Sequence, residues 1–278
     1  MKILHPLVKR FIAGYNFDSA KPVIDKLLDQ GYEVSIDYLG ELSKTKEDCR
    51  AAAKQYHKIL EFYKDKKIDI SIKPSQLGLL LDFHFCKTLL RDIAATAKRH
   101  NHTIRLDMED ARVTQDTIKL ALLLNDEFKN VGIAIQSNLF RTEKDLEILI
   151  RNNISVRLVK GAYKENKEIA YQKDDDVNLS FFSHACTLYS EKANRPAVAT
   201  HDEELLEDIE ELIPTHFENE FLYGIRRDLQ RKFLQTSKAP VRIYVPFGEQ
   251  WFPYILRRLK EWKNLKFVVR NVLYELFK

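Results

Sequence analysis

Charged and polar residues stand at the ends of short apolar runs along this 278-residue chain. They are Lys73, Asp107, Gln136, Arg157, Lys160 and His201. One charged residue in such a place is often half of a salt bridge at a rim. Burying several charges costs several kcal/mol unless they are paired, so a repeated pattern of this kind is usually kept for a ligand. We therefore expect these side chains to converge on one site.

The basic members of this candidate site outnumber the acidic ones. They are Lys73, Arg157, Lys160, Arg257 and Arg258. Guanidinium groups hold carboxylates and phosphates through paired, charge-assisted hydrogen bonds, so the excess favours an anionic ligand. Arg257 and Arg258 would project about 100° apart on a helix. Glu261 follows closely enough to orient either arginine. A solvated helix face is the alternative for this stretch alone.

Lys160 has two interpretations from the residues alone. A lysine that ends a barrel strand could form a Schiff base with a carbonyl substrate. The neighbouring Gly161 instead indicates close backbone approach to a bulky, phosphate-bearing ligand. No HExxH spacing occurs among the eight histidines, so no metal site is predicted. We interpret His201, which follows Thr200 at a strand end, as a hydrogen-bond donor to a cofactor, with a structural role as the alternative.

Eight apolar runs alternate with amphipathic stretches, and each run is typical of a strand buried on both faces. The runs are residues 33–38, 68–73, 103–107, 131–136, 155–160, 196–201, 218–222 and 241–246. This order predicts an α/β fold, a closed (βα)8 barrel of the TIM type. A doubly wound sheet is the competing architecture, but no GxGxxG or Walker loop is present.

The helical stretches complete the expected barrel. Thr114 is the predicted N-cap of a helix over 114–129, and a last helix is predicted over about 250–263. An extra helix over 17–30 should precede the first strand. We therefore expect an N-terminal helical segment, residues 1–30, packed on a catalytic barrel that spans residues 31–278.

Composition excludes several classes of protein. The 45 Lys and Arg are interspersed with 41 Asp and Glu, for a net charge of +4, which is not typical of a nucleic-acid binder. The three cysteines lie far apart, as expected for reduced thiols in a cytoplasmic protein. No apolar run approaches the roughly 18 residues of a membrane span.

The C-terminal stretch, 264–278, alternates apolar and basic residues, so it is either a packed helix or a peripheral membrane anchor.

Several motifs occur together in one order along the chain. They are RFIAG at 10–14, SIKPS at 71–75, RLVKGAY at 157–163, ATH at 199–201, FLYG at 221–224, YVPFG at 244–248 and RRLKE at 257–261. In this set the chain resembles the proline dehydrogenase family over nearly its whole length. That family includes small monofunctional enzymes and the dehydrogenase domain of bifunctional proline utilisation proteins.

The resemblance implies a distorted barrel that binds FAD and oxidises L-proline to 1-pyrroline-5-carboxylate. It also implies electron transfer to a membrane quinone and a pyrroline-5-carboxylate dehydrogenase as the downstream partner. By this resemblance the substrate would be bound by Lys73, Leu222, Tyr244, Arg257, Arg258 and Glu261. Asp107 would set Lys73, and Arg157 would lie near the flavin N5. The other cofactor contacts would be Met108, Gln136, Lys160, Gly161, Ala162, Thr200 and His201.

One matched position departs from the family pattern, because Met108 stands where relatives often have a small residue. Two other functions stay open beside the dehydrogenase. A Schiff-base lyase would use Lys160 and hold no flavin. A non-catalytic barrel would bind proline or flavin without turnover.

Overall fold

The computed structural model describes residues 10–213 and 217–261 and, in the final helix, the side chains up to Leu256. Its eight strands are parallel and close into a barrel in the order β1 to β8, which confirms the predicted architecture. The strands are β1 (Glu33–Tyr38), β2 (Asp69–Ile72), β3 (Thr103–Leu106), β4 (Val131–Gln136), β5 (Val156–Val159), β6 (Ala197–Ala199), β7 (Glu218–Leu222) and β8 (Val241–Phe247).

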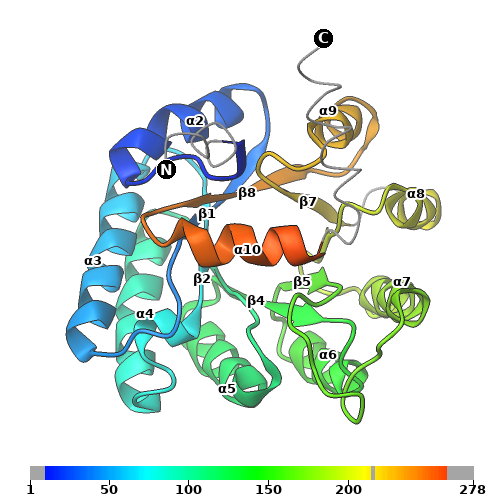
Figure 1. Ribbon diagram of the computed structural model, residues 1–278, viewed down its shortest axis with the longest axis horizontal. Helices are drawn as coiled ribbons and strands as arrows, with labels where there is room; N and C mark the ends of the chain where they lie inside the picture. Colours follow the sequence, from blue (N-terminus) through cyan, green and yellow to red (C-terminus); the bar gives the residue numbers. More distant parts are fainter. Residues whose placement is uncertain (1–9, 214–216, 262–278) are drawn as a thin grey trace.

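A helix follows each strand, and all of these helices except the last surround the barrel (Figure 1). They are α3 (Lys46–Phe62), α4 (Phe83–Arg99), α5 (Ala111–Phe128), α6 (Thr142–Arg151), α7 (Asp174–Ser190), α8 (Glu203–Leu212), α9 (Arg227–Thr236) and α10 (Trp251–Glu261), with a short 3₁₀ turn, η2 (Pro74–Leu77), before α4. None of the helices in the described ranges is long and apolar enough to cross a membrane. The stretch 264–278 lies outside the described residues.

The predicted start of one helix was wrong. Helix α5 begins at Ala111, and its N-cap is Asp110, whose carboxylate accepts a hydrogen bond from the Arg112 N–H. Thr114 is buried inside the first turn and a half of this helix. Asp110 is the better cap because its carboxylate also carries a negative charge toward the positive helix terminus.

Alternation along the strands divides the barrel into two kinds of buried surface. On β1, Val34 and Ile36 pack in the main hydrophobic core, whereas Ser35 and Asp37 are buried polar residues. The Arg157 guanidinium on β5 contacts the Ser35 hydroxyl on β1 at 3.5 Å, and these two strands are not neighbours. Such a contact is possible only through the interior of the barrel. The polar set therefore faces inward and the apolar set faces the helices.

The end of the barrel where the strands begin is closed by buried ion pairs. Arg242 donates to both carboxylate oxygens of Glu218, at 2.6 and 2.9 Å, and also pairs with Glu33. Arg105 approaches Glu218 at 3.8 Å and Asp69 at 3.6 Å. Burial alone would raise the pKa of Glu218, but Arg242 and Arg105 outweigh it and lower that pKa below its ordinary value of 4.5.

Replacing Glu218 with glutamine is expected to lower the free energy of unfolding at pH 7 by about 3–5 kcal/mol, since it breaks a buried ion pair. A carboxyl with a lowered pKa in the folded state stabilises above its unfolded pKa, and the contribution is lost as pH falls. Urea unfolding of Glu218→Gln between pH 3 and 7 should therefore show a weaker loss of stability on acidification than the wild type. A variant with an unchanged pH dependence would contradict this role. Glu127→Gln, in an exposed pair with Arg91, is the matched control.

At the other end, α10 lies across the mouth of the barrel (Figure 1). A second hydrophobic cluster holds it there, made of Phe11, Ile12, Leu39, Ile225, Tyr254 and Ile255. The N-terminal segment is tied to β8 and to the residue directly after it, since the Ala13 N–H donates to the Pro246 carbonyl and the Gly248 N–H to the Gly14 carbonyl, both at 2.9 Å. Helix α2 (Phe17–Asp29) follows and buries Phe17 and Ile24 in the main core.

Candidate functional site

The mouth of the barrel holds a lysine surrounded by three acceptors. Lys73 follows β2, and its ammonium lies 3.0 Å from Asp37 Oδ2, 3.2 Å from Asp107 Oδ2 and 3.2 Å from the Tyr244 hydroxyl oxygen. The Tyr244 hydroxyl itself donates to Asp107 Oδ2 at 2.6 Å. An ammonium has three N–H donors, so each of them has an acceptor in this arrangement. The four side chains come from β1, from β8 and from the residues directly after β2 and β3, and they fix one another.

Arg157 lies beside this group and connects it to the opposite wall. Its guanidinium donates to Asp107 Oδ1, to Glu220 Oε2 and to the Ser71 hydroxyl oxygen, each at 2.7 Å. The guanidinium carbon lies 5.2 Å from the centre of the Tyr244 ring, within the range of a cation–π contact. The geometry thus places Arg157 between two carboxylates and close to an aromatic ring.

The surroundings shift the pKa values of these groups in opposite directions. Burial raises the pKa of Asp37, and the nearby Lys73 offsets only part of that shift. For Asp107 burial is outweighed by Lys73 and Arg157, which lower its pKa. The two carboxylates likewise outweigh burial at Lys73 and raise the pKa of its ammonium. Burial, with Asp107, raises the pKa of Tyr244 well above 10.0. At neutral pH the site therefore presents an ammonium ion and a phenol that donates a hydrogen bond to a carboxylate.

The sequence argument counted the cations of the site but not the carboxylates that pair with them inside the described part of the barrel. The buried cations there are Lys73, Arg105, Arg157 and Arg242, and the buried carboxylates are Asp37, Asp69, Asp107, Glu218 and Glu220. Each cation has a carboxylate on another strand within 4.0 Å. A bare count of strand-end residues missed these pairs because the partners belong to runs far apart in the sequence.

Two functional candidates were missed by the sequence argument, and both end up deep in the barrel. Asp37 and Glu220 are 0% and 2% exposed, and one carboxylate oxygen of each has no hydrogen-bond partner among the described residues. A signal was present, since Ser35 and Asp37 alternate with Val34 and Ile36 inside one predicted strand, and Glu218 and Glu220 stand two residues apart in another. Polar residues at every second position of a strand buried on both faces indicate a polar barrel interior.

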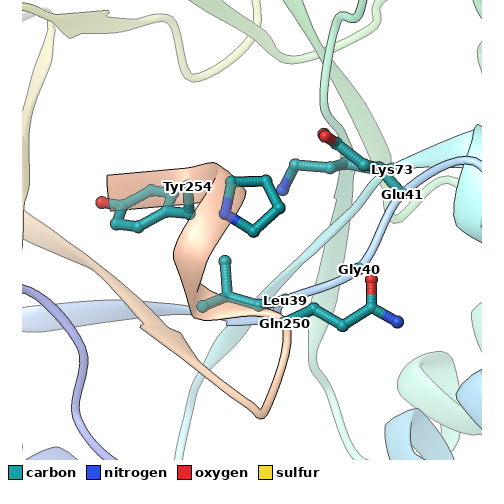
Figure 2. Close-up of a pocket in the computed structure, with 7 residues that line it drawn as sticks. Leu39, Gly40, Glu41, Lys73, Gln250 and Tyr254 are labelled. Carbon is teal, nitrogen blue, oxygen red and sulfur yellow. The ribbon is translucent and has the colours of Figure 1, made fainter. Parts of the chain in front are cut away.

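A small pocket opens beside Lys73 under α10. It is lined by Leu39, Gly40, Glu41, Lys73, Gln250, Pro253 and Tyr254. Figure 2 shows the Lys73 side chain extending toward α10, which carries Tyr254, while Leu39 and Gly40 come from the loop after β1. The sequence argument did not include Glu41 or this loop. The pocket lies where β1, β2 and β8 end. Of the predicted site residues whose side chains the structure describes, Lys73 lines it.

A second group of predicted residues follows β4, β5 and β6. The Lys160 ammonium donates to Asp202 Oδ2 at 2.6 Å, and both side chains are about one-third exposed. An ammonium held in this way has no lone pair for attack on a carbonyl, so nothing in the geometry favours a Schiff base. Gly161 has a φ of +118°, and a Cβ on it would lie 2.4 Å from Asn138 Oδ1. The close approach at this glycine is therefore to the Asn138 side chain.

The remaining predicted cofactor contacts lie around the same rim. The Gln136 amide donates to the Glu109 carbonyl at 3.0 Å, Met108 and Thr200 are buried, and Ala162 is exposed. His201 Nε2 accepts the Leu222 N–H at 3.0 Å, so the predicted hydrogen bond to a cofactor would come from Nδ1. A neutral His201 therefore carries its proton on Nδ1.

Three predicted substrate contacts are not placed by these observations. Arg257, Arg258 and Glu261 belong to α10, whose backbone crosses the barrel mouth, but their side chains lie outside those that the structure describes. Leu222 and Tyr244 are neighbours across β7 and β8, since they pair in register. The structure therefore brings together Lys73, Asp107, Arg157, Tyr244 and Leu222 at one mouth.

Comparison with known proteins gives a consistent result. The family model described as proline dehydrogenase matches residues 20–270. The chain is 34% identical to proline dehydrogenase from Deinococcus radiodurans over 285 residues, covering 96% of this chain and 90% of the relative. It is 31% identical to proline dehydrogenase 1 from Bacillus subtilis (strain 168) over 274 residues, covering 95% and 90%.

A solved structure is similar in fold. Proline utilization A (PutA) from Bdellovibrio bacteriovorus, inactivated by N-propargylglycine, superimposes with a TM-score of 0.86 at 23% identity. The match covers 94% of this chain and 33% of that one, so the chain spans about a third of the length of that solved neighbour. The likeness extends to the barrel as a whole.

Proposed function

The chain belongs to the proline dehydrogenase family, and we propose that it oxidises L-proline to 1-pyrroline-5-carboxylate with FAD, passing the electrons to a quinone. It is an oxidoreductase, and its likeness to named proline dehydrogenases supports proline as the substrate. The observation that carries the finer proposal is the buried lysine at the pocket, held by Asp37, Asp107 and Tyr244.

In this proposal Lys73 provides the positive charge for the substrate carboxylate, together with Arg257 and Arg258 of α10, which Glu261 would orient. A fixed ammonium favours a carboxylate through a charge-assisted hydrogen bond. Because all three Lys73 donors are engaged, the substrate would share or replace one of these acceptors. Tyr244 and Leu222 would pack against the ring of the amino acid. Holding a substrate at its carboxylate fixes the position of its reacting carbon.

The rim after β4 to β6 suits a large phosphate-bearing cofactor. Lys160 supplies a partly exposed cation there, and the buried Asn138 Oδ1 has no hydrogen-bond partner among the described residues. FAD, when bound, supplies the two-electron acceptor for the oxidation. The residues that would hold it are Met108, Gln136, Arg157, Lys160, Gly161, Ala162, Thr200 and His201. Arg157 would place its positive charge near the reacting edge of the cofactor, where a fixed cation stabilises developing negative charge.

The product and its further fate belong to the same proposal. Loss of a hydride and a proton from the proline ring gives the cyclic imine 1-pyrroline-5-carboxylate. A 1-pyrroline-5-carboxylate dehydrogenase would then act on it as the downstream partner. Similarity to proteins named bifunctional PutA is compatible with this pairing, although the match covers 24% of the Escherichia coli protein.

The test is a visible absorption spectrum of the purified protein before and after anaerobic L-proline. We expect flavin bands that bleach when proline is added, because the substrate reduces the bound cofactor. D-proline is the matched control, since it presents the same groups in the wrong arrangement. Flavin bands that persist with L-proline would keep the cofactor and reject the substrate. A protein that stays colourless after FAD is added would reject both.

A further inference from the structure

A buried carboxylate outside the predicted site connects three loops at the barrel mouth. Glu109 follows β3 and is 4% exposed. Its Oε1 accepts the Ser75 N–H at 2.9 Å, and its Oε2 accepts the Ser75 hydroxyl. The backbone carbonyl of Glu109 accepts the Gln136 amide from β4 at 3.0 Å. Glu109 is therefore fixed on one side by β4 and holds the loop after β2 on the other.

The Ser75 contact caps the turn that carries Lys73. Lys73 is the N-cap of η2, but its side chain makes no capping hydrogen bond. Proline follows as the first residue of the turn, and Ser75 is the second, whose N–H an N-cap side chain would normally satisfy. The Glu109 carboxylate accepts that N–H from a neighbouring strand instead. Glu109 therefore caps the turn in place of the Lys73 side chain, which enters the barrel.

Ser75 also holds the loop after β1 through two hydrogen bonds. Its hydroxyl oxygen accepts the Leu42 N–H at 3.0 Å, and its carbonyl accepts the Ser43 N–H at 3.2 Å. The residues directly before Leu42, Gly40 and Glu41, line the pocket beside Lys73. One carboxylate thus sets the backbone on two sides of the pocket.

We propose that Glu109 is a positioning residue for substrate binding, acting through Ser75 on the turn that carries Lys73 and on the pocket loop 40–43. The inference rests on the proposed function only for the identity of the substrate. Glu109 does not line the pocket. Its effect should therefore fall on the affinity for L-proline and much less on the turnover of bound substrate.

The decisive variant is Glu109→Gln, which keeps the shape of the side chain. One acceptor oxygen becomes an NH₂ donor facing Ser75, so the serine N–H or hydroxyl loses its acceptor. We expect KM for L-proline to rise about 10-fold, the effect of losing a hydrogen bond to a charged group, with kcat changed by less than about 3-fold. Hydrogen exchange at the Leu42 and Ser43 amides should become faster. Ser75→Ala should reproduce both changes, and the double variant should be no worse than Ser75→Ala alone.

A matched control exists at the opposite end of the barrel. Glu210 of α8 accepts the Ser237 hydroxyl and also the Asn219 amide, at 2.8 Å for the latter. Glu210→Gln breaks the same kind of pair far from the pocket, so KM and exchange in loop 40–43 should stay as in the wild type. The Glu109→Asp variant keeps the charge and should recover part of the affinity for proline.

The outcomes separate the two proposals. Unchanged KM and unchanged exchange in Glu109→Gln, or equal effects in Glu210→Gln, would overturn the positioning role while wild-type turnover stands. A loss of kcat without a change in KM would also overturn it. If the wild type fails to oxidise proline, the proposed function falls, and the exchange at Leu42 and Ser43 alone decides whether Glu109 holds the loop.

Discussion

Replacing Arg157 with methionine should lower the free energy of unfolding by about 3–5 kcal/mol and reduce kcat/KM for L-proline by about 100-fold or more. The loss of stability follows from the two carboxylates that the guanidinium pairs, Asp107 and Glu220, which would stay buried without a cation. The loss of activity follows from the proposed place of Arg157 beside the cofactor. Urea unfolding and steady-state turnover measure the two effects separately.

A second substitution distinguishes charge balance from chemistry at Arg157. Glu220→Gln removes one of the two carboxylates that Arg157→Met leaves without a cation. The double variant Arg157→Met/Glu220→Gln should therefore regain part of the lost stability. It should not regain turnover, because no cation returns to the site. Recovery of activity in the double variant would show that Arg157 only balances buried charge. The exposed Arg91, paired with Glu127, is the control for loss of an arginine, and Arg91→Met should leave turnover unchanged.

Replacing Lys73 with methionine should raise KM for L-proline by about 10- to 100-fold, the effect of losing a charge-assisted contact to the substrate carboxylate. The substitution also leaves Asp37 and Asp107 facing each other without the ammonium between them. Two adjacent buried carboxylates favour uptake of a proton by one of them. We expect Asp37 to take it, since burial already raises its pKa in the wild type.

This proton uptake gives Lys73→Met a characteristic pH dependence. A carboxyl with a raised folded-state pKa stabilises fully below its unfolded pKa, near 3.8 for Asp37, and that contribution is lost as pH rises through the folded pKa. Relative to the wild type, Lys73→Met should therefore lose stability as pH rises from about 4 to 8. Adding Asp37→Asn should remove most of that slope and leave KM high. A flat pH dependence in Lys73→Met alone would contradict the proposed charge balance.

Both substitutions test the same physical feature, a barrel whose interior is charged. Removing one partner of a buried ion pair is costly because the remaining charge lacks both water and its counter-ion. Asp107 belongs to both halves of the network, since it accepts from Lys73, from Tyr244 and from Arg157. The effects of Lys73→Met and Arg157→Met should therefore not add when the two are combined.

Local sequence patterns determined the barrel and its polar mouth. Eight apolar runs predicted the eight strands, and the bounds of β1, β4 and β7 agree to the residue. Buried parallel strands must be apolar toward their helices, and this requirement can be recognised within each short segment of the sequence. The same reasoning found Lys73 and Asp107, which directly follow β2 and β3, because the ends of parallel strands meet at one face of a barrel. Arg157, predicted at a strand end, is instead the second residue of β5.

Only the tertiary structure decided which charges pair and which backbone each of them holds. Arg157 meets Asp107, Glu220 and Ser71 across 50, 63 and 86 residues of chain. Glu109 caps a turn that lies 34 residues before it. A single sequence carries no distance between such residues, since strand tilt and register set which inward side chains share a layer. The sequence thus determined which residue types reach the mouth, whereas closure of the barrel determined their partners and, through them, the geometry of the site.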